Sequence, residues 1–168
     1  MASKDDGKAE VCAWIRENFS TATILDVGAC DGKWRKLLPE YTMDAVEIFP
    51  PNAEAIKPLY RTVYQGDVCD ISYGRYDLII FGDVIEHMTP ARAKAALECA
   101  KTRCTDMVIG VPWLYKQDAI YGNPWEVHIQ DDLTPALFAE RYKGFEVLYN
   151  AGADYCYYHK EQKRWIER

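Results

Sequence analysis

The sequence lacks the features that mark several large classes of protein. It has six cysteines but no C-x-x-C pair, which argues against a zinc site or a disulfide framework and favours reduced cytosolic thiols. No stretch approaches the roughly 18 apolar residues of a membrane span, and residues 1–10 carry no apolar core of a signal peptide. We therefore expect a cytoplasmic protein with no membrane partner.

An excess of basic residues is also missing. Lys and Arg number 20 against 26 Asp and Glu, a formal charge of −6. Nucleic-acid binding normally requires a broad basic face, so a nucleic-acid partner is not expected. What is present is ordinary for a globular protein, with 49% hydrophobic and 27% charged residues in 168. This length predicts one domain, residues 1–168, with its own core.

The stretch around which the chain is organised is a glycine turn. An apolar run, residues 24–27, is typical of a buried parallel strand and ends at Gly28. Gly32 follows, and a helix is predicted over 33–38. Two close glycines allow a sharp turn and close approach of a ligand, and the helix start directs free amides at the same space. The pattern predicts a turn that cradles a nucleotide.

The turn differs from two common nucleotide loops. Cys30 stands where a dinucleotide fingerprint has its middle glycine, and Lys33 is followed by Trp34 rather than by the Ser or Thr of a P-loop. Asp31 adds a negative charge that suits a ligand with a cationic amino group better than a pyrophosphate.

Two stretches resemble motifs of the class I S-adenosylmethionine-dependent methyltransferases. The turn, Asp26 to Gly32, resembles their motif I, which reads D-x-G-x-G-x-G, and residues 76–87, with Y-D-L-I followed by D-V-I-E-H, resemble their motif IV. The resemblance implies an α/β, three-layer Rossmann-like methyltransferase fold with a seven-stranded, mostly parallel sheet and an antiparallel C-terminal strand. It implies S-adenosyl-L-methionine as the cofactor.

The same resemblance implies which residues contact the cofactor. Glu47, 21 positions after Asp26 at the end of a predicted strand, would accept hydrogen bonds from the ribose hydroxyls, although an acid there is also simply a solvated strand end. Asp67 would contact the adenine amino group, although Gly-Asp is also an ordinary turn. The full set of implied contacts is Asp26, Gly28, Ala29, Gly32, Glu47, Ile48, Asp67, Val68, Gly82 and Asp83.

The remaining pattern fits the implied element order. Helices are predicted over 8–19, 33–38, 52–58, 90–102 and 135–142, and strands over 24–27, 43–48, 61–65, 76–81, 107–111, 145–149 and 155–159, the last two as an antiparallel hairpin. Thr89 and Thr134 each precede a proline, which predicts an N-cap followed by proline in the first turn. The short stretch 69–75 predicts a turn in place of a helix.

Acidic and histidine side chains gather after the predicted central strand. If helical geometry begins at Asp83, then Asp83, Glu86 and His87 share one face, and His128 could join them from a later loop. Asp83, His87 and His128 are the candidate catalytic residues. Glu86, His87 and His128 are candidate ligands of a divalent cation. A metal site, a metal-free role in catalysis or substrate binding, and a structural role remain open for this group.

The loop over residues 112–131 is long and aromatic, so we expect it to be functional rather than disordered. Trp113, Tyr115, Tyr121 and Trp125 could stack on a sugar or planar acceptor, or simply pack as a lid. Residues 122–128 resemble a segment of methyltransferases associated with sugars. The acid-His-His set resembles the metal site of small-RNA 2′-O-methyltransferases, although Asp83 stands where those enzymes have Glu.

The sequence thus predicts an S-adenosylmethionine-dependent methyltransferase that acts on an oxygen of a small hydroxylated molecule or sugar. Three alternatives stay open: a metal-assisted 2′-O-type RNA methyltransferase, a non-catalytic S-adenosylmethionine-binding protein, and an NAD(P)- or nucleotide-sugar-dependent Rossmann enzyme. The oligomeric state is left open.

Overall fold

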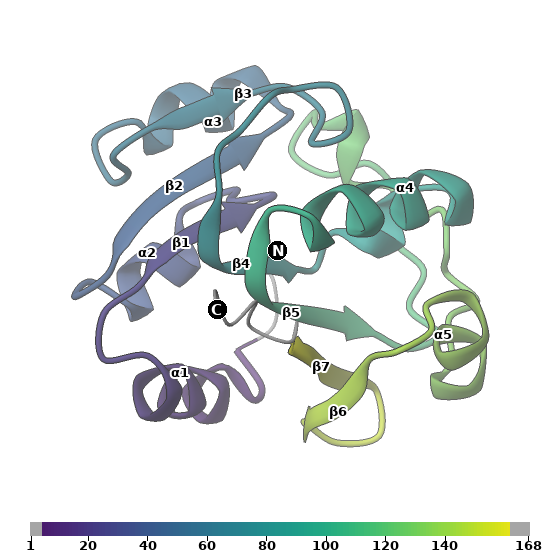
Figure 1. The fold of residues 1–168 in the computed structure, drawn as a ribbon. Coiled ribbons are helices and arrows are strands. Elements are labelled where there is room, and N and C mark those ends of the chain that lie inside the picture. The colour runs from purple at the N-terminus through teal and green to yellow at the C-terminus, as the bar shows by residue number, and fades with distance from the viewer. Residues whose placement is uncertain (1–4, 162–168) are drawn as a thin grey trace.

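Apolar runs of the sequence form the central strands of one seven-stranded sheet. The computed structural model describes residues 5–161 (Figure 1). The strand order is β3-β2-β1-β4-β5-β7-β6, and β7 alone runs antiparallel to its neighbours. The strands are β1 (Thr23–Val27), β2 (Thr42–Glu47), β3 (Val63–Gln65), β4 (Tyr76–Gly82), β5 (Cys104–Pro112), β6 (Glu146–Asn150) and β7 (Tyr155–Glu161). The predicted fold class is confirmed.

Helices cover both faces of this sheet. Along β4, Leu78 and Ile80 point into one apolar cluster, and Ile79 and Phe81 point into the other, as the two-residue repeat of a strand requires. The first cluster is covered by α1 (Lys8–Asn18), α2 (Lys33–Leu37) and α3 (Pro50–Ile56). The second is covered by α4 (Pro90–Lys101) and α5 (Pro135–Arg141), so the fold has three layers (Figure 1).

The helix starts follow the predicted capping. The Thr89 hydroxyl accepts a hydrogen bond from the Arg92 amide at 3.3 Å, and the Thr134 hydroxyl accepts one from the Leu137 amide at 3.2 Å. Residues 69–75 form no helix, as predicted. The helix predicted over 52–58 instead begins at Pro50, because a proline in the first turn needs no amide hydrogen.

The strand order reverses between β1 and β4, which places a crevice at the carboxyl ends of these strands. β5 is longer than predicted because Cys104 and Asp106 pair with β4 at one end and Pro112 pairs with β7 at the other. Among residues 5–161, no helix has the length and apolar character that crossing a membrane requires.

Candidate functional site

A cavity of about 390 Å³ opens where the carboxyl ends of β1, β2 and β4 meet. It is the place where a parallel α/β sheet usually binds its ligand. Seven of the ten predicted cofactor residues line it, together with all three candidate metal ligands. The lining residues that sequence analysis predicted are Gly28, Ala29, Glu47, Ile48, Asp67, Gly82, Asp83, Glu86, His87 and His128.

The glycine turn forms one wall of the cavity. Gly28 has φ +70° and Gly32 has φ +76°, in the left-handed region that favours glycine. A Cβ added at Gly28 would lie 2.6 Å from Cγ2 of Val84. The Gly28 and Ala29 amides both donate to the carbonyl of Val46, at 2.8 and 3.3 Å. The turn therefore requires glycine and is held tightly against β2.

Glu47 ties this turn to the end of β2. Its Oε2 accepts a hydrogen bond from the Cys30 amide and its Oε1 accepts one from the Phe49 amide, both at 2.8 Å. The side chain is buried, and burial raises its pKa, while the two amide hydrogen bonds oppose that shift. A carboxylate has about four acceptor positions, so Glu47 keeps acceptor capacity for a ligand in the cavity.

Three predicted cofactor residues lie outside the lining of the cavity. Asp26 sits below the turn, where the Tyr60 hydroxyl donates to its Oδ2 at 2.5 Å. Burial, partly opposed by that hydrogen bond, raises the pKa of Asp26 to about 7. Val68 is a buried core residue, and Gly32 caps α2. Asp26, Gly32 and Val68 therefore support the residues that line the cavity and do not face it themselves.

Asp67 lines the cavity with both carboxylate oxygens already engaged. The Cys69 amide donates to Oδ1 at 2.8 Å, and the Arg92 guanidinium donates to Oδ2 at 3.0 Å. Arg92, in the first turn of α4, also lines the cavity and was not singled out by sequence analysis. In the sequence, Arg92 looks like any solvent-exposed charged residue in the first turn of a helix.

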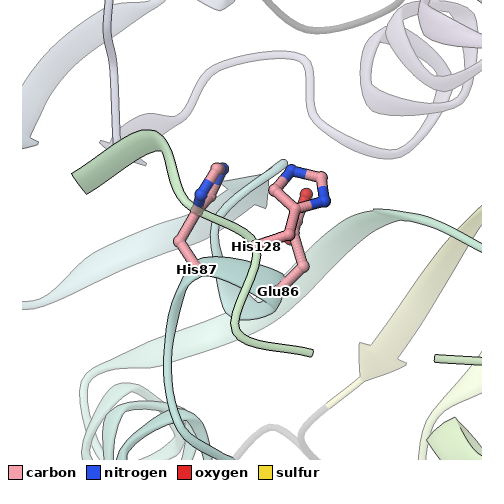
Figure 2. Close-up of side chains that lie close together, drawn as sticks. All are labelled: Glu86, His87 and His128. Atoms are coloured by element: carbon pink, nitrogen blue, oxygen red, sulfur yellow. The ribbon is translucent and has the colours of Figure 1, made fainter. Parts of the chain in front are cut away.

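The assumption that helical geometry begins at Asp83 is wrong. Asp83 has φ +57°, a left-handed conformation that Asp tolerates better than most residues. A short 3-10 turn, η1 (Ile85–His87), starts two residues later. It still brings Glu86 and His87 to His128, and ligand atoms of these three residues all lie within 4.8 Å of one another (Figure 2). Asp83 is not part of this group, which we call the acid–histidine trio.

Backbone carbonyls orient both histidines of the trio. Nδ1 of His87 lies 3.2 Å from the carbonyl oxygen of Val127, and Nδ1 of His128 lies 2.7 Å from that of Tyr115. A carbonyl only accepts, so each Nδ1 must carry the proton, and each Nε2 keeps a lone pair. Burial, with His128 adding to it, lowers the pKa of His87 to about 4, and burial also lowers the pKa of His128. Both rings are neutral at pH 7.

Glu86 supplies the acidic member of the trio. It is 1% exposed, and neither carboxylate oxygen has a hydrogen-bond partner within residues 5–161. Burial raises its pKa well above the ordinary value, and Asp83 adds to this shift. A buried carboxylate without a partner is costly unless it is protonated or binds a cation. Two imidazole nitrogens and one carboxylate form a donor set that fits a divalent transition metal.

Lys8 is a residue of this site that sequence analysis missed. Its side chain is 2% exposed, with Nζ 3.7 Å from Oδ2 of Asp83 and 5.3 Å from the centre of the Trp34 ring. Burial lowers its pKa, and the charge of Asp83 opposes that shift. In the sequence, Lys8 is one charged residue at the start of an amphipathic helix, so its burial had no local signal.

The aromatic residues of the long loop divide into two groups. Tyr115 and Trp125 line the cavity and remain partly exposed, Trp125 within the 3-10 turn η2 (Pro124–Glu126). Trp113 is buried in the core, and Tyr121 is exposed outside the lining. Only the first pair is placed to contact a molecule in the cavity.

No protein-family model matches the sequence, and no curated protein matches it. Solved structures match in fold. An S-adenosylmethionine-dependent methyltransferase from Clostridium acetobutylicum is 10% identical, with a TM-score of 0.69 over 93% of this chain and 95% of that one. The methyltransferase domain of bacterial CtHen1-CN is 19% identical, with a TM-score of 0.67 over 92% and 96%.

A third solved structure is the N-terminal domain of EvdMO1 in the presence of SAH and D-fucose. It is 18% identical, with a TM-score of 0.65 over 96% of this chain and 85% of that one. Identities this low show the fold alone. The chain has the Rossmann-like fold of the class I S-adenosylmethionine-dependent methyltransferases.

Proposed function

We propose that this protein is an S-adenosylmethionine-dependent methyltransferase that methylates an oxygen atom of a small hydroxylated molecule or sugar. One observation carries the proposal: the glycine turn and the acid–histidine trio open into the same cavity. A cofactor wall and a group of proton acceptors in one cavity are what transfer of a methyl group to a hydroxyl requires.

The walls of the cavity fit S-adenosylmethionine better than a dinucleotide. Glu47 offers carboxylate acceptors to ribose hydroxyls, and Asp83 offers negative charge to a cationic amino group, as Asp31 does at the turn. Lys33, a cation in the wall, lies 2.9 Å from Asp5 in an ion pair. A pyrophosphate would meet these acids unfavourably, which argues against an NAD(P)-dependent enzyme. When bound, S-adenosylmethionine supplies an electrophilic methyl group.

The trio supplies the proton acceptor. His87 and His128 are neutral at pH 7, and each keeps a lone pair at Nε2, so either can take the proton that the acceptor hydroxyl loses. If a divalent cation is used, Glu86, His87 and His128 would hold it, and its charge would make the hydroxyl more acidic. The buried, unpartnered Glu86 carboxylate supports this part of the proposal.

Two observations support a sugar as the acceptor. Tyr115 and Trp125 offer ring faces in the cavity wall, and aromatic faces pack well against apolar faces of ligands. The EvdMO1 domain, which shares the fold, was crystallised in the presence of D-fucose.

A second candidate is metal-assisted 2′-O methylation of RNA. The sequence pattern favours it, because Glu86, His87 and His128 resemble part of the metal site of small-RNA 2′-O-methyltransferases. Asp83, which stands where those enzymes have Glu, lies outside the trio. The net charge of −6 and the acidic residues of the cavity wall oppose it, since a polyanion needs compensating cations.

Transfer of a tritiated methyl group from S-adenosylmethionine tests both candidates in one assay. Free and nucleotide-linked deoxysugars and short RNAs serve as acceptors, with and without EDTA. We expect transfer to a sugar hydroxyl that His87→Ala or His128→Ala reduces at least about 100-fold. His159→Ala, which removes a hydrogen bond to Asp106 outside the cavity, should not change it. Transfer to RNA alone would favour the second candidate, and cofactor binding without transfer would favour a non-catalytic protein.

A further inference from the structure

We propose that Gln130 is a positioning residue that sets the place of His128 relative to Glu86 and His87. The inference rests on the site proposed above, because it concerns how the acid–histidine trio is held together. The residues of the trio come from two segments about 40 residues apart in the sequence, η1 and the loop before α5. Contacts between these segments must therefore fix their relative position.

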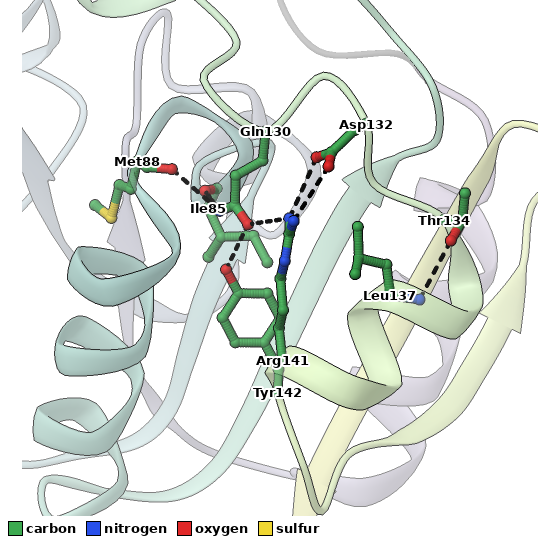
Figure 3. A network of polar contacts seen from close by, with 8 residues as sticks. All are labelled: Ile85, Met88, Gln130, Asp132, Thr134, Leu137, Arg141 and Tyr142. Carbon is green, nitrogen blue, oxygen red and sulfur yellow. Dashed lines mark hydrogen bonds and ion pairs between the residues drawn. The ribbon is translucent and has the colours of Figure 1, made fainter.

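The side-chain amide of Gln130 uses its whole hydrogen-bonding capacity between these segments. Its Nε2 donates to the carbonyl oxygens of Ile85 at 2.7 Å and Met88 at 3.1 Å, the first residue of η1 and the residue that follows it (Figure 3). Its Oε1 accepts from Nη1 of Arg141 at 3.0 Å and from the hydroxyl of Tyr142 at 2.8 Å. Gln130 is 2% exposed, so water cannot readily replace these bonds.

The backbone adds to the same connection. The amides of Ile129 and Gln130 both donate to the carbonyl of Glu86, at 2.8 and 2.9 Å. A 3-10 turn of three residues without a side-chain cap has little stability of its own. Since His128 lies two residues before Gln130, the bonds that hold η1 also place His128. Among the standard side chains only Gln and the shorter Asn combine two N–H donors with a carbonyl oxygen that can accept two hydrogen bonds.

One hydrogen bond depends directly on the relative position of η1 and the loop. Nδ1 of His87 faces the Val127 carbonyl and so joins η1 to the loop, whereas Nδ1 of His128 faces the Tyr115 carbonyl within the loop. If Gln130 holds the two segments together, its loss must disturb the first bond and spare the second. A general loss of stability would not separate the two histidines in this way.

Gln130→Glu is the informative variant. The carboxylate keeps the size of the side chain and still accepts from Arg141 and Tyr142, but it places an oxygen against the carbonyls of Ile85 and Met88. Asp132→Asn is the matched control, because it weakens the 3.1 Å ion pair with Arg141 and leaves Gln130 in place. Gln130→Ala removes all four side-chain bonds.

The test is nitrogen-15 NMR of histidine-labelled protein at pH 7, which reads the protonated ring nitrogen of each of the three histidines. We expect both Gln130 variants to lose the Nδ1–H preference of His87, while His128, His159 and the Asp132→Asn control keep wild-type signals. Affinity for Co²⁺, followed by its visible absorption, should fall 10- to 100-fold in Gln130→Glu.

Folded Gln130 variants in which His87 and His128 both keep the wild-type proton on Nδ1 would overturn the inference. Failure of both Gln130 variants to fold, beside a folded Asp132→Asn, would also overturn it, by assigning Gln130 to the fold rather than to the site. The NMR measurement needs no cofactor, metal or acceptor, so its outcome is separate from the success or failure of the proposed methyl transfer.

Discussion

His87 meets His128 edge to face, with ring centroids 4.6 Å apart and ring planes at 83°. Each ring has Nδ1 beside a backbone carbonyl, which leaves Nε2 with the lone pair, and ligand atoms of both histidines and Glu86 lie within 4.8 Å of one another (Figure 2). Carbonyl-anchored imidazoles are the usual support of metal-binding histidines. The same arrangement also suits a pair of proton acceptors, and the two uses make different predictions.

If the acid–histidine trio binds a divalent cation, Co²⁺ will stabilise the protein. At a concentration about one hundred times Kd, binding adds about 2.7 kcal/mol to the free energy of unfolding, which raises Tm by about 5–10 °C. Glu86→Gln and His128→Ala should each abolish most of this shift in a thermal melt, since each removes one ligand.

His159→Ala is the control for metal binding, because His159 pairs with Asp106 at 2.9 Å and lies outside the trio. It should keep the full Co²⁺ shift. A wild-type Tm that Co²⁺ does not change would leave the trio with a metal-free role only.

Gly28→Ala should destabilise the fold and remove cofactor binding. The added Cβ would lie 2.6 Å from Val84 in a backbone conformation that alanine disfavours, so we expect a loss of about 1–3 kcal/mol in the free energy of unfolding. Gly74→Ala is the matched substitution, because nothing lies within 4 Å of its Cβ and its φ is not positive. It should be neutral or stabilising by up to about 1 kcal/mol. Equal urea midpoints for the two variants would contradict this account of the turn.

Asp26 gives the stability a specific pH dependence. Its carboxyl keeps a proton up to about pH 7 in the folded protein, whereas its ordinary pKa is 3.8. The folded state therefore binds more protons between about pH 4 and 7, and the contribution of this group, complete below pH 4, is lost as the pH rises to 7. One proton gives a slope of at most about 1.4 kcal/mol per pH unit.

Asp26→Asn should remove that slope. The amide oxygen can still accept from the Tyr60 hydroxyl, so the difference in unfolding free energy between variant and wild type should grow in favour of the variant from pH 4 to 7. Urea unfolding at several pH values measures it. A difference that stays constant over this range would mean that Asp26 is ionised throughout.

Most of the fold could be predicted from the sequence because its signals are local. The apolar run of β4, the two glycines of the turn and the Thr-Pro helix starts each act within a few residues, and the structure confirms them. The parts that failed depend on contacts across the fold. Helical spacing was extrapolated from Asp83, but the backbone of Asp83 is left-handed, and the 3-10 turn begins only at Ile85.

The supporting residues of the site had no local signal at all. Lys8 is buried beside Asp83 and the rings of Trp34 and Tyr155. Gln130 is buried between α5 and η1. Arg92 reaches the cavity from α4 because Asp67 and Asp70 lie across from it. Each of these positions is set by residues distant in the sequence, and single-sequence patterns do not record such distances.

Calorimetric titration with S-adenosylhomocysteine tests the central claim most directly. Wild-type protein should bind it in the micromolar range and should not bind NADH tightly. Glu47→Gln should weaken binding at least about tenfold, because it removes the negative charge that accepts hydrogen bonds from the Cys30 and Phe49 amides and, in our proposal, from the ribose. Glu54→Gln, exposed on α3, is the control and should not weaken binding. No binding by the wild type, or equal binding by both variants, would contradict the assignment of this cavity to S-adenosylmethionine.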